Sequence, residues 1–157
     1  MNELSQLQQS IISRLTVADT MVPSPVPVNG QINWITEDIG DLASIINKTV
    51  GSVGIIGIVM TPGGLDRCKM FQVGIVPISF LCPVEVQVQE NVTINRNTGT
   101  KVSALDLVVF SMQRLHLWSP GRQRISRMQL DETPYLLVTE APILTYNVRF
   151  MAKVSIT

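Results

Sequence analysis

Charged side chains are scarce in this sequence. Only 15% of its 157 residues are Asp, Glu, Lys or Arg, against about a quarter in a typical soluble domain. The 12 basic and 12 acidic residues also cancel. A dedicated nucleic-acid binder needs a basic excess to neutralise phosphates, so this balance disfavours DNA or RNA binding as the main function. Two interpretations of the low charge stay open: a large core under a surface of uncharged polar residues, or an outer surface that a partner covers.

Cysteine and histidine are equally rare. Cys68 and Cys82 are too few for a disulfide framework and lack metal-ligand spacing, so we expect buried or idle thiols, which fit a reducing compartment. His116 is the one histidine, and no serine or cysteine stands in a nucleophile-elbow pattern. The acidic residues form no series of metal-ligand type. The sequence therefore predicts no enzyme, no catalytic residue, no metal site and no cofactor.

A membrane-spanning run is missing as well. The apolar segment 50–60 is interrupted by glycine and is far shorter than the roughly 18 residues that a membrane helix needs. The N-terminal residues lack the basic and apolar regions of a signal peptide. We expect a protein that is made in the cytoplasm, has no membrane contact, and forms a single domain over residues 1–157.

The first third of the chain predicts two helices and an arm. Apolar residues share one face of a helix over residues 2–17, and a second helix is expected from about 38 to 48, with Thr36 as its cap and Gly51 after its end. Between them, residues 18–30 carry a proline at every second position of one stretch, which enforces an extended path. We interpret this segment as a Pro-rich extended arm, and its prolines are Pro23, Pro25 and Pro27. The residues of the first helix that are expected to face inward are Leu4, Leu7, Ile11, Ile12 and Leu15.

Most of the remaining chain predicts strands. Residues 53–60 form a continuous apolar run that is typical of a strand buried on both faces. Residues 71–94 indicate a strand pair or one long bent strand, and 122–130 and 135–139 are further candidates. Residues 143–157 alternate apolar and polar side chains almost throughout, which predicts a half-buried antiparallel strand.

The segment 90–120 organises the chain. It predicts a strand end, a polar turn at 97–100, and one long amphipathic helix capped by Thr100 or Ser103 and stopped by Pro120. The apolar stripe expected to face the core comprises Val102, Leu105, Val108, Val109, Met112, Leu115 and Leu117. The element order favours an α+β fold: a mixed, mainly antiparallel β-sheet with the N-terminal helix and the long central helix packed on one face.

The same segment resembles a known family. Its Glu90-Asn91, Asn95-Arg96, Thr-Gly turn, Ala104-Leu105-Asp106 and Leu115-His116-Leu117-Trp118 before Pro120 are similar to the tail terminator (tail completion) proteins of tailed bacteriophages and related phage-like particles. Leu117 replaces a glycine that the family pattern has at this place. Outside residues 90–120, the resemblance extends only to the order of the elements.

The resemblance implies a structural virion protein of the tail or neck, assembled in the host cytoplasm. Such a protein forms a homohexameric ring that caps the head-proximal end of a tail tube, ends tube growth and joins the tail to the neck. Its implied partners are copies of itself, the tail tube protein and a neck or connector protein, and DNA only passes through the lumen. The candidate assembly contacts are Pro23, Pro25, Pro27, Arg96, His116 and Trp118.

Two alternatives stay open. Within the same class, the chain is a head-closure or neck protein, or a ring subunit related to the tail tube. In a different class, it is a small cytoplasmic protein-binding module that uses the Pro-rich arm as a ligand. Self-association distinguishes the two classes, because a ring subunit assembles whereas a binding module stays monomeric.

Overall fold

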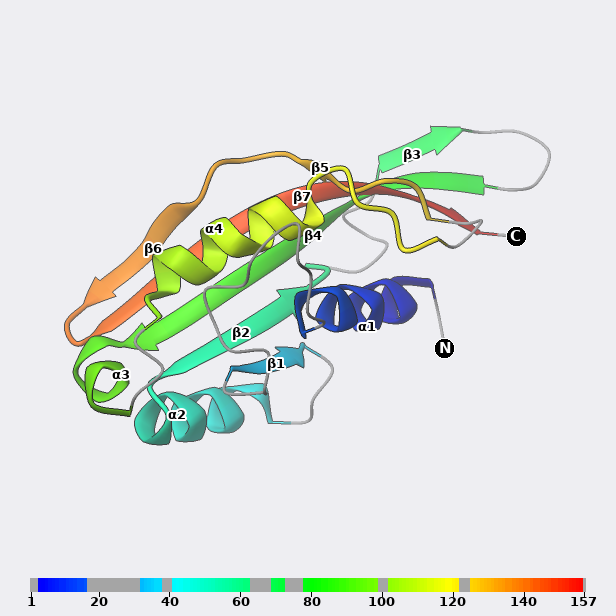
Figure 1. Ribbon diagram of the computed structural model, residues 1–157. Helices are drawn as coiled ribbons and strands as arrows, with labels where there is room; N and C mark the ends of the chain where they lie inside the picture. Colours follow the sequence, from blue (N-terminus) through cyan, green and yellow to red (C-terminus); the bar gives the residue numbers. More distant parts are fainter. Residues whose placement is uncertain are drawn as a thin grey trace.

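The computed structural model describes residues 3–16, 32–37, 41–62, 69–72, 78–98, 102–121 and 125–156 (Figure 1). The predicted arm, residues 18–30, lies outside these ranges. The elements are, in order, α1 (Glu3–Thr16), β1 (Asn33–Thr36), α2 (Leu42–Ser52), β2 (Ile55–Met60), β3 (Lys69–Gln72), β4 (Ile78–Asn91), α3 (Val92–Thr98), α4 (Ala104–Leu115), β5 (Gln129–Leu130), β6 (Tyr135–Glu140) and β7 (Ile143–Ile156). No helix among the described residues is long and apolar enough to span a membrane.

The strands form one mixed sheet built around the long pair β4 and β7. These two strands pair antiparallel along their full length, from Ile78 opposite Ile156 to Asn91 opposite Ile143. β2 joins the other side of β4, and β1 extends the sheet by pairing parallel with β2. β5 and β6 both pair with the free side of β7, and β3 pairs with β4. The predicted mixed, mainly antiparallel sheet is confirmed.

The main core lies between one face of the sheet and the helices α1 and α4. Alternate residues of β4 and β7 point into it, because successive side chains of a strand face opposite sides. The predicted face of α1 is confirmed, as is the packing of the N-terminal and central helices on one face. The fully buried core side chains include Leu7, Ile11, Val84, Val86, Val88, Leu107, Val108, Val148, Phe150 and Val154.

A smaller core lies on the opposite face, under α2. There Ile56 and Ile58 of β2 contact the inner side of α2, whereas Ile55 and Val59 of the same strand belong to the main core. β2 is therefore buried on both faces, as its continuous apolar run predicts. Helices thus cover both faces of the sheet at its β1–β2 end.

Two glycines allow close approaches that a side chain would block. A Cβ at Gly57 would overlap the ring of Trp34, so the missing side chain makes room for this ring in the neighbouring strand. Gly54 has a φ of +93°, and a Cβ at this position would lie 2.5 Å from the backbone nitrogen of Asn95. The strand that carries Trp34, β1, is absent from the sequence-based expectations because four residues are too few to show a period.

The central segment differs from the single long helix that the sequence predicts. A short helix, α3, replaces the expected strand end and turn, because Asn91 caps it by accepting a hydrogen bond from the Ile94 N–H (3.1 Å). α4 then begins after Ser103, whose hydroxyl accepts from the Asp106 N–H (3.1 Å). α4 ends at Leu115, before the proline that was expected to stop it.

The buried side of α4 is also rotated from the predicted stripe. Leu105, Val109 and Leu117 are exposed by 44%, 41% and 54%. Phe110 and Arg114, which lie outside the stripe, are buried instead because α1 packs along their side of the helix. The stripe was right at Val102, Val108 and Leu115, which are buried, and wrong at Leu105, Val109 and Leu117, because apolar residues occur on two sides of this helix.

Three further expectations were wrong in detail. α2 begins at Leu42 with Asp41 as its cap, while Thr36 belongs to β1 and Gly51 lies inside the helix. Of the candidate strand 122–130, the structure describes residues 125–130, and within these Gln129–Leu130 is a strand and Ile125 forms an isolated bridge with Val154. Cys82 is buried, but it is disulfide-bonded and not a thiol, which removes the argument for a reducing compartment. This was not predictable because the spacing of cysteines in the sequence does not show which Cβ atoms come within bonding range.

Candidate assembly surface

Glu90 and Asn95, two residues of the sequence motif, form a buried polar junction. Both oxygens of the Glu90 carboxylate are used: Oε1 accepts from Asn95 Nδ2 (2.9 Å) and Oε2 accepts from the Ala104 N–H (2.8 Å). Asn95 Nδ2 also donates to the Val102 carbonyl (2.7 Å). Negative charge at the first turn of a helix is favourable. The junction thus joins the end of β4 to α3 and to the start of α4.

Arg96 follows this junction but points to solvent. It is exposed in the last turn of α3, and it borders a shallow pocket of about 420 Å³. The lining residues of this pocket are Glu90, Val92, Asn95, Arg96, Ser103 and Leu144. Arg96 is therefore placed where a partner can reach it, whereas its motif neighbours hold the subunit together.

His116 and Trp118 hold the segment that follows α4. His116 is exposed, and its Nδ1 is placed to accept a hydrogen bond from the Leu130 N–H of β5 (3.1 Å). Trp118 is half-buried against the main core, and the Arg14 guanidinium lies 6.0 Å from its ring centroid. Both residues thus make contacts within the subunit, and His116 keeps a surface open to a partner.

Leu117, between them, has an unusual backbone. Its φ is +60°, in the left-handed region that favours glycine. Its N–H donates to the Met128 carbonyl (2.7 Å), which ties the turn to the segment before β5. The geometry explains why a glycine suits this place in the family pattern. Leu117 forms the same turn with a strained backbone. Its side chain is the most exposed of the large apolar side chains that the structure describes.

A larger set of exposed apolar side chains lies on β6, at the outer edge of the sheet, and on α4 (Figure 1). We call it the β6–α4 strip and define it by the five exposed side chains Leu105, Val109, Leu136, Leu137 and Val138, which are exposed by 40–44%. Three of them are consecutive in β6. No predicted site residue belongs to this strip.

Part of the strip lies on the side of the sheet that α4 covers, whereas Val138, which lies opposite Thr145, faces the other side. Leu105 and Val109 follow the side of α4 that ends at His116, and His116 bonds to β5. β5 and β6 both pair with the same edge of β7. Leu136 lies opposite Tyr146, whose ring packs against the main core, so Leu136 shares the sheet face that α4 covers.

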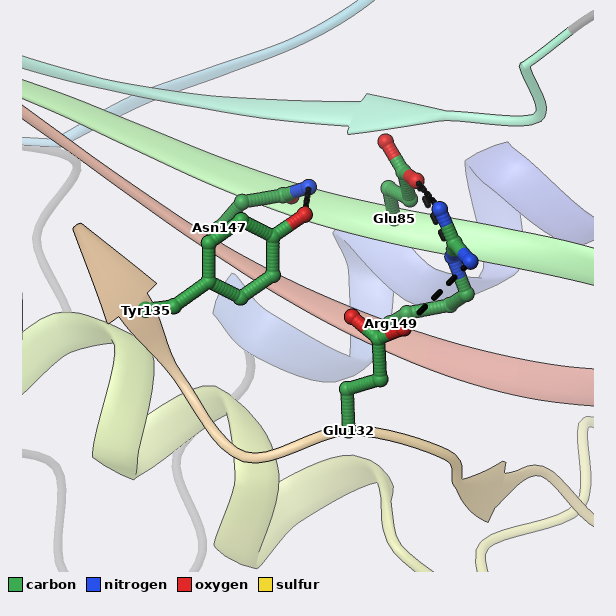
Figure 2. Close-up of polar contacts among 5 residues, drawn as sticks. All are labelled: Glu85, Glu132, Tyr135, Asn147 and Arg149. Carbon is green, nitrogen blue, oxygen red and sulfur yellow. Dashed lines mark hydrogen bonds and ion pairs between the residues drawn. The ribbon is translucent and has the colours of Figure 1, made fainter. Parts of the chain in front are cut away.

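The opposite face of the same strands carries a cluster of polar contacts (Figure 2). Arg149 of β7 donates to Glu85 of β4 through Nη2 (2.8 Å) and Nε (3.1 Å), and pairs at 3.5 Å with Glu132 just before β6. The hydrogen bond to Glu85 raises the pKa of Arg149 above its ordinary value. Tyr135 and Asn147 are joined by a hydrogen bond of 3.1 Å. These contacts fix the start of β6 to the sheet.

The strip is absent from the sequence-based predictions although the sequence carries two signals of it. YLLVTE contains three consecutive apolar residues where a strand with one wet face would alternate. The segment of α4 also has more apolar residues than one helix face can hold. Both groups of additional apolar residues are equally compatible with a buried core, and the sequence analysis interpreted them as core residues.

Comparison with solved structures finds the same fold in an assembled particle. A chain of the structure described as "Virion of native gene transfer agent (GTA) particle" matches with a TM-score of 0.58 and 13% sequence identity, over 99% of this chain and 99% of that chain. At this identity the match shows a shared fold. No protein-family model and no curated protein sequence matches the chain.

Within the described part of the chain, no group of three or more His, Cys, Asp or Glu side chains is placed to hold a metal ion. The feature that asks for a functional explanation is therefore the exposed apolar surface and the residues that border it.

Proposed function

We propose that the protein is a structural subunit of a phage-like virion: a tail terminator that forms a ring, caps the head-proximal end of the tail tube, ends tube growth and joins the tail to the neck. The observation that carries this proposal is the full-length fold match to a virion chain. Because the match covers 99% of both chains, the whole α+β unit corresponds to the virion subunit.

The sequence motif supports the same class by an independent route. The fold match depends on backbone shape, whereas the resemblance to tail terminators depends on side chains in residues 90–120. Glu90 and Asn95 of that motif form the buried junction that positions α4, so the motif has a physical role in this fold.

Self-association in a ring accounts for the composition. The chain carries no net charge, so little electrostatic repulsion opposes contact between copies. The β6–α4 strip is apolar and uncovered in the single subunit. The proposed contacts with neighbours, tube and neck include the arm at Pro23, Pro25 and Pro27, and the residues Arg96, His116 and Trp118. DNA passes through the lumen without being bound.

The test combines assembly with a tube assay. The purified protein is measured by light scattering and negative-stain imaging, then added to growing tail tubes of the same particle. We expect a mass near six subunits or ring assembly on the tube, with shorter tubes at higher protein concentration. If the protein neither binds tube ends nor changes tube length, the terminator function is excluded.

Two controls separate the alternatives. A ring that binds the isolated neck or connector but not the tube would favour a head-closure protein. A strict monomer that ignores both and recruits one cellular protein would favour the binding module.

A further inference from the structure

β4 changes its partner strand partway along one edge. Its other edge pairs with β7 over the full length, so β2 and β3 share the remaining edge. β2 pairs with residues 85–90 of β4, and β3 pairs with residues 79–81. Neither register includes residues 82–84, and Pro83 in the middle of this stretch has no N–H to donate. The hydrogen-bonded ladder on this edge is therefore interrupted beside Cys82.

β3 is attached to the sheet at few points. It has four residues, its register shifts between Met70 and Gln72, and its main contacts with described elements are those with β4. It lies at the end of β4 that is far from α2 and α3 (Figure 1). A short two-stranded ribbon is at best marginally stable in water. Backbone pairing alone is therefore a weak attachment for β3.

Cys82 offers a covalent attachment at this place. It is disulfide-bonded, and its side chain is fully buried in the main core. The sequence has one other cysteine, Cys68, which directly precedes the first residue of β3. That first residue, Lys69, lies opposite Leu81. In an antiparallel pair, the residue before one member faces the residue after the other, so one further step of this register pairs position 68 with Cys82.

We propose that Cys82 is joined to Cys68 of the same chain, and that this disulfide is a redox-sensitive fastener that holds β3 on β4 where the ladder is interrupted. Forming the bond removes two protons and two electrons from the two thiols. A small disulfide such as oxidised glutathione accepts them and leaves as two thiols. The fastener belongs to the single subunit and does not depend on the proposed function.

The two ends of the bond differ in how firmly the fold holds them. On the β4 side, Cys82 lies opposite Ala152 of β7, and both residues are fully buried. On the β3 side, the short strand depends on its pairing with β4. A bond between positions 68 and 82 closes a loop of about 15 residues, and the chain entropy that it removes changes an opening equilibrium by about a hundredfold. The oxidised subunit thus keeps β3 closed, and reduction lets it open.

The first experiment identifies the bond. The full chain is equilibrated with equal amounts of oxidised and reduced glutathione, quenched with acid and digested with trypsin without reductant. Trypsin cuts after Lys69, which separates the two cysteines. We expect mass spectrometry to find the peptide with Cys68 linked to the peptide with Cys82. Free thiols at both positions, or a link between two copies of Cys82, would overturn the inference.

The second experiment measures what the bond holds. Backbone hydrogen exchange is followed by mass spectrometry in the oxidised chain, in the reduced chain and in Cys68→Ser. We expect exchange in β3 to become about a hundredfold faster in the reduced chain. Exchange at Ile56 and Ile58 of β2, which pair with the same edge of β4, should stay unchanged. An equal acceleration in both strands would show a general effect on stability and would overturn the role as a fastener of β3.

Cys68→Ser separates loss of the bond from other effects of the reductant. It leaves Cys82 in the core, so we expect its β3 to exchange as fast as in the reduced wild type, with no further change when reductant is added. Circular dichroism checks that the variant is folded, and the reduced wild type supplies the same comparison if it is not. Equal exchange of β3 in the oxidised and reduced chains would overturn the inference, whereas tube capping alone decides the proposed function.

Discussion

β6 and β7 are neighbouring, hydrogen-bonded strands, yet they expose their apolar residues very differently. In β7, Val148, Phe150 and Val154 alternate with polar residues and are fully buried. In β6, three consecutive apolar residues are exposed by 40–43%. The comparison shows that apolar content does not by itself mark the core. Alternation marks a strand that covers a core, whereas the unbroken apolar run of β6 lies at the sheet edge and is exposed.

Position in the sheet causes this difference. β7 lies between β4 and the pair β5 and β6, so both of its edges are paired and one of its faces is covered by α4. β6 has one paired edge, and its faces extend beyond the helices. The same residue types therefore stabilise the subunit in β7 and stay exposed to solvent in β6.

The largest expected effect tests the β7 side of the comparison. Phe150→Ala removes a fully buried ring from the main core, and we expect the free energy of unfolding to fall by about 3–5 kcal/mol. Urea denaturation at a concentration below assembly measures it. Leu137→Ala in β6 is the matched control, with a change of about 0.5 kcal/mol or less. Equal losses of stability for the two variants would refute the division between a core strand and an exposed strand.

The next effect concerns the polar junction at the end of β4. Glu90→Ala leaves the Ala104 N–H and the Asn95 amide without their buried acceptor, and we expect a loss of about 3 kcal/mol in stability. Glu140→Ala, at the exposed end of β6, is the control and changes stability by about 0.5 kcal/mol or less. A loss at position 90 as small as the control would mean that the junction does not position α4.

Alanine substitutions at two glycines, Gly57 and Gly51, should change stability in opposite directions and by smaller amounts. Gly57→Ala forces a methyl group into the ring of Trp34, and we expect it to cost about 2 kcal/mol. Gly51→Ala meets nothing within 4 Å in the exposed part of α2, and it should stabilise by about 0.5–1 kcal/mol because alanine favours helix. Thermal unfolding of both variants measures the difference. A stabilising Gly57→Ala would show that Trp34 does not lie over β2.

The smallest effect concerns Leu117. Replacing Leu117 by glycine removes the strain of the left-handed backbone, which stabilises the folded state by about 1–2 kcal/mol. Glycine also loses more backbone entropy on folding, which costs about 0.5–1 kcal/mol. We therefore expect Leu117→Gly to stabilise the subunit by roughly 0.5 kcal/mol. Leu117→Ala keeps the strained backbone and should show no such gain. Denaturation of the two variants in parallel tests this. A less stable glycine variant would mean that the Leu117 side chain supports the fold.

The parts of the fold that follow from local spacing were predictable. The face of α1 repeats every three or four residues and packs as expected, and the alternation in β7 predicts the buried side of the longest strand pair. The buried side of α4 was predictable only in part: Val108 was placed correctly, but Leu105 and Val109 fit a helix stripe as well as the buried Leu107 does. The neighbour α1 decides between them, and it is distant in sequence.

The candidate site was predictable only in part. The motif positions Glu90 and Asn95 were found, but as family residues rather than as a buried junction. Arg96 and His116 are exposed and Trp118 is half-buried, and their roles in assembly stay predictions. The β6–α4 strip was missed, because exposure depends on which strand ends the sheet.

Local sequence was enough to establish the elements with a strong period, the α+β class and the absence of net charge, since each is a property of neighbouring residues or of composition. The packed fold was needed to establish which side of α4 is buried, how Glu90 is satisfied, and that β6 lies at an open edge. Those features depend on contacts between segments far apart in the chain, because burial is a property of the neighbours that a residue acquires on folding.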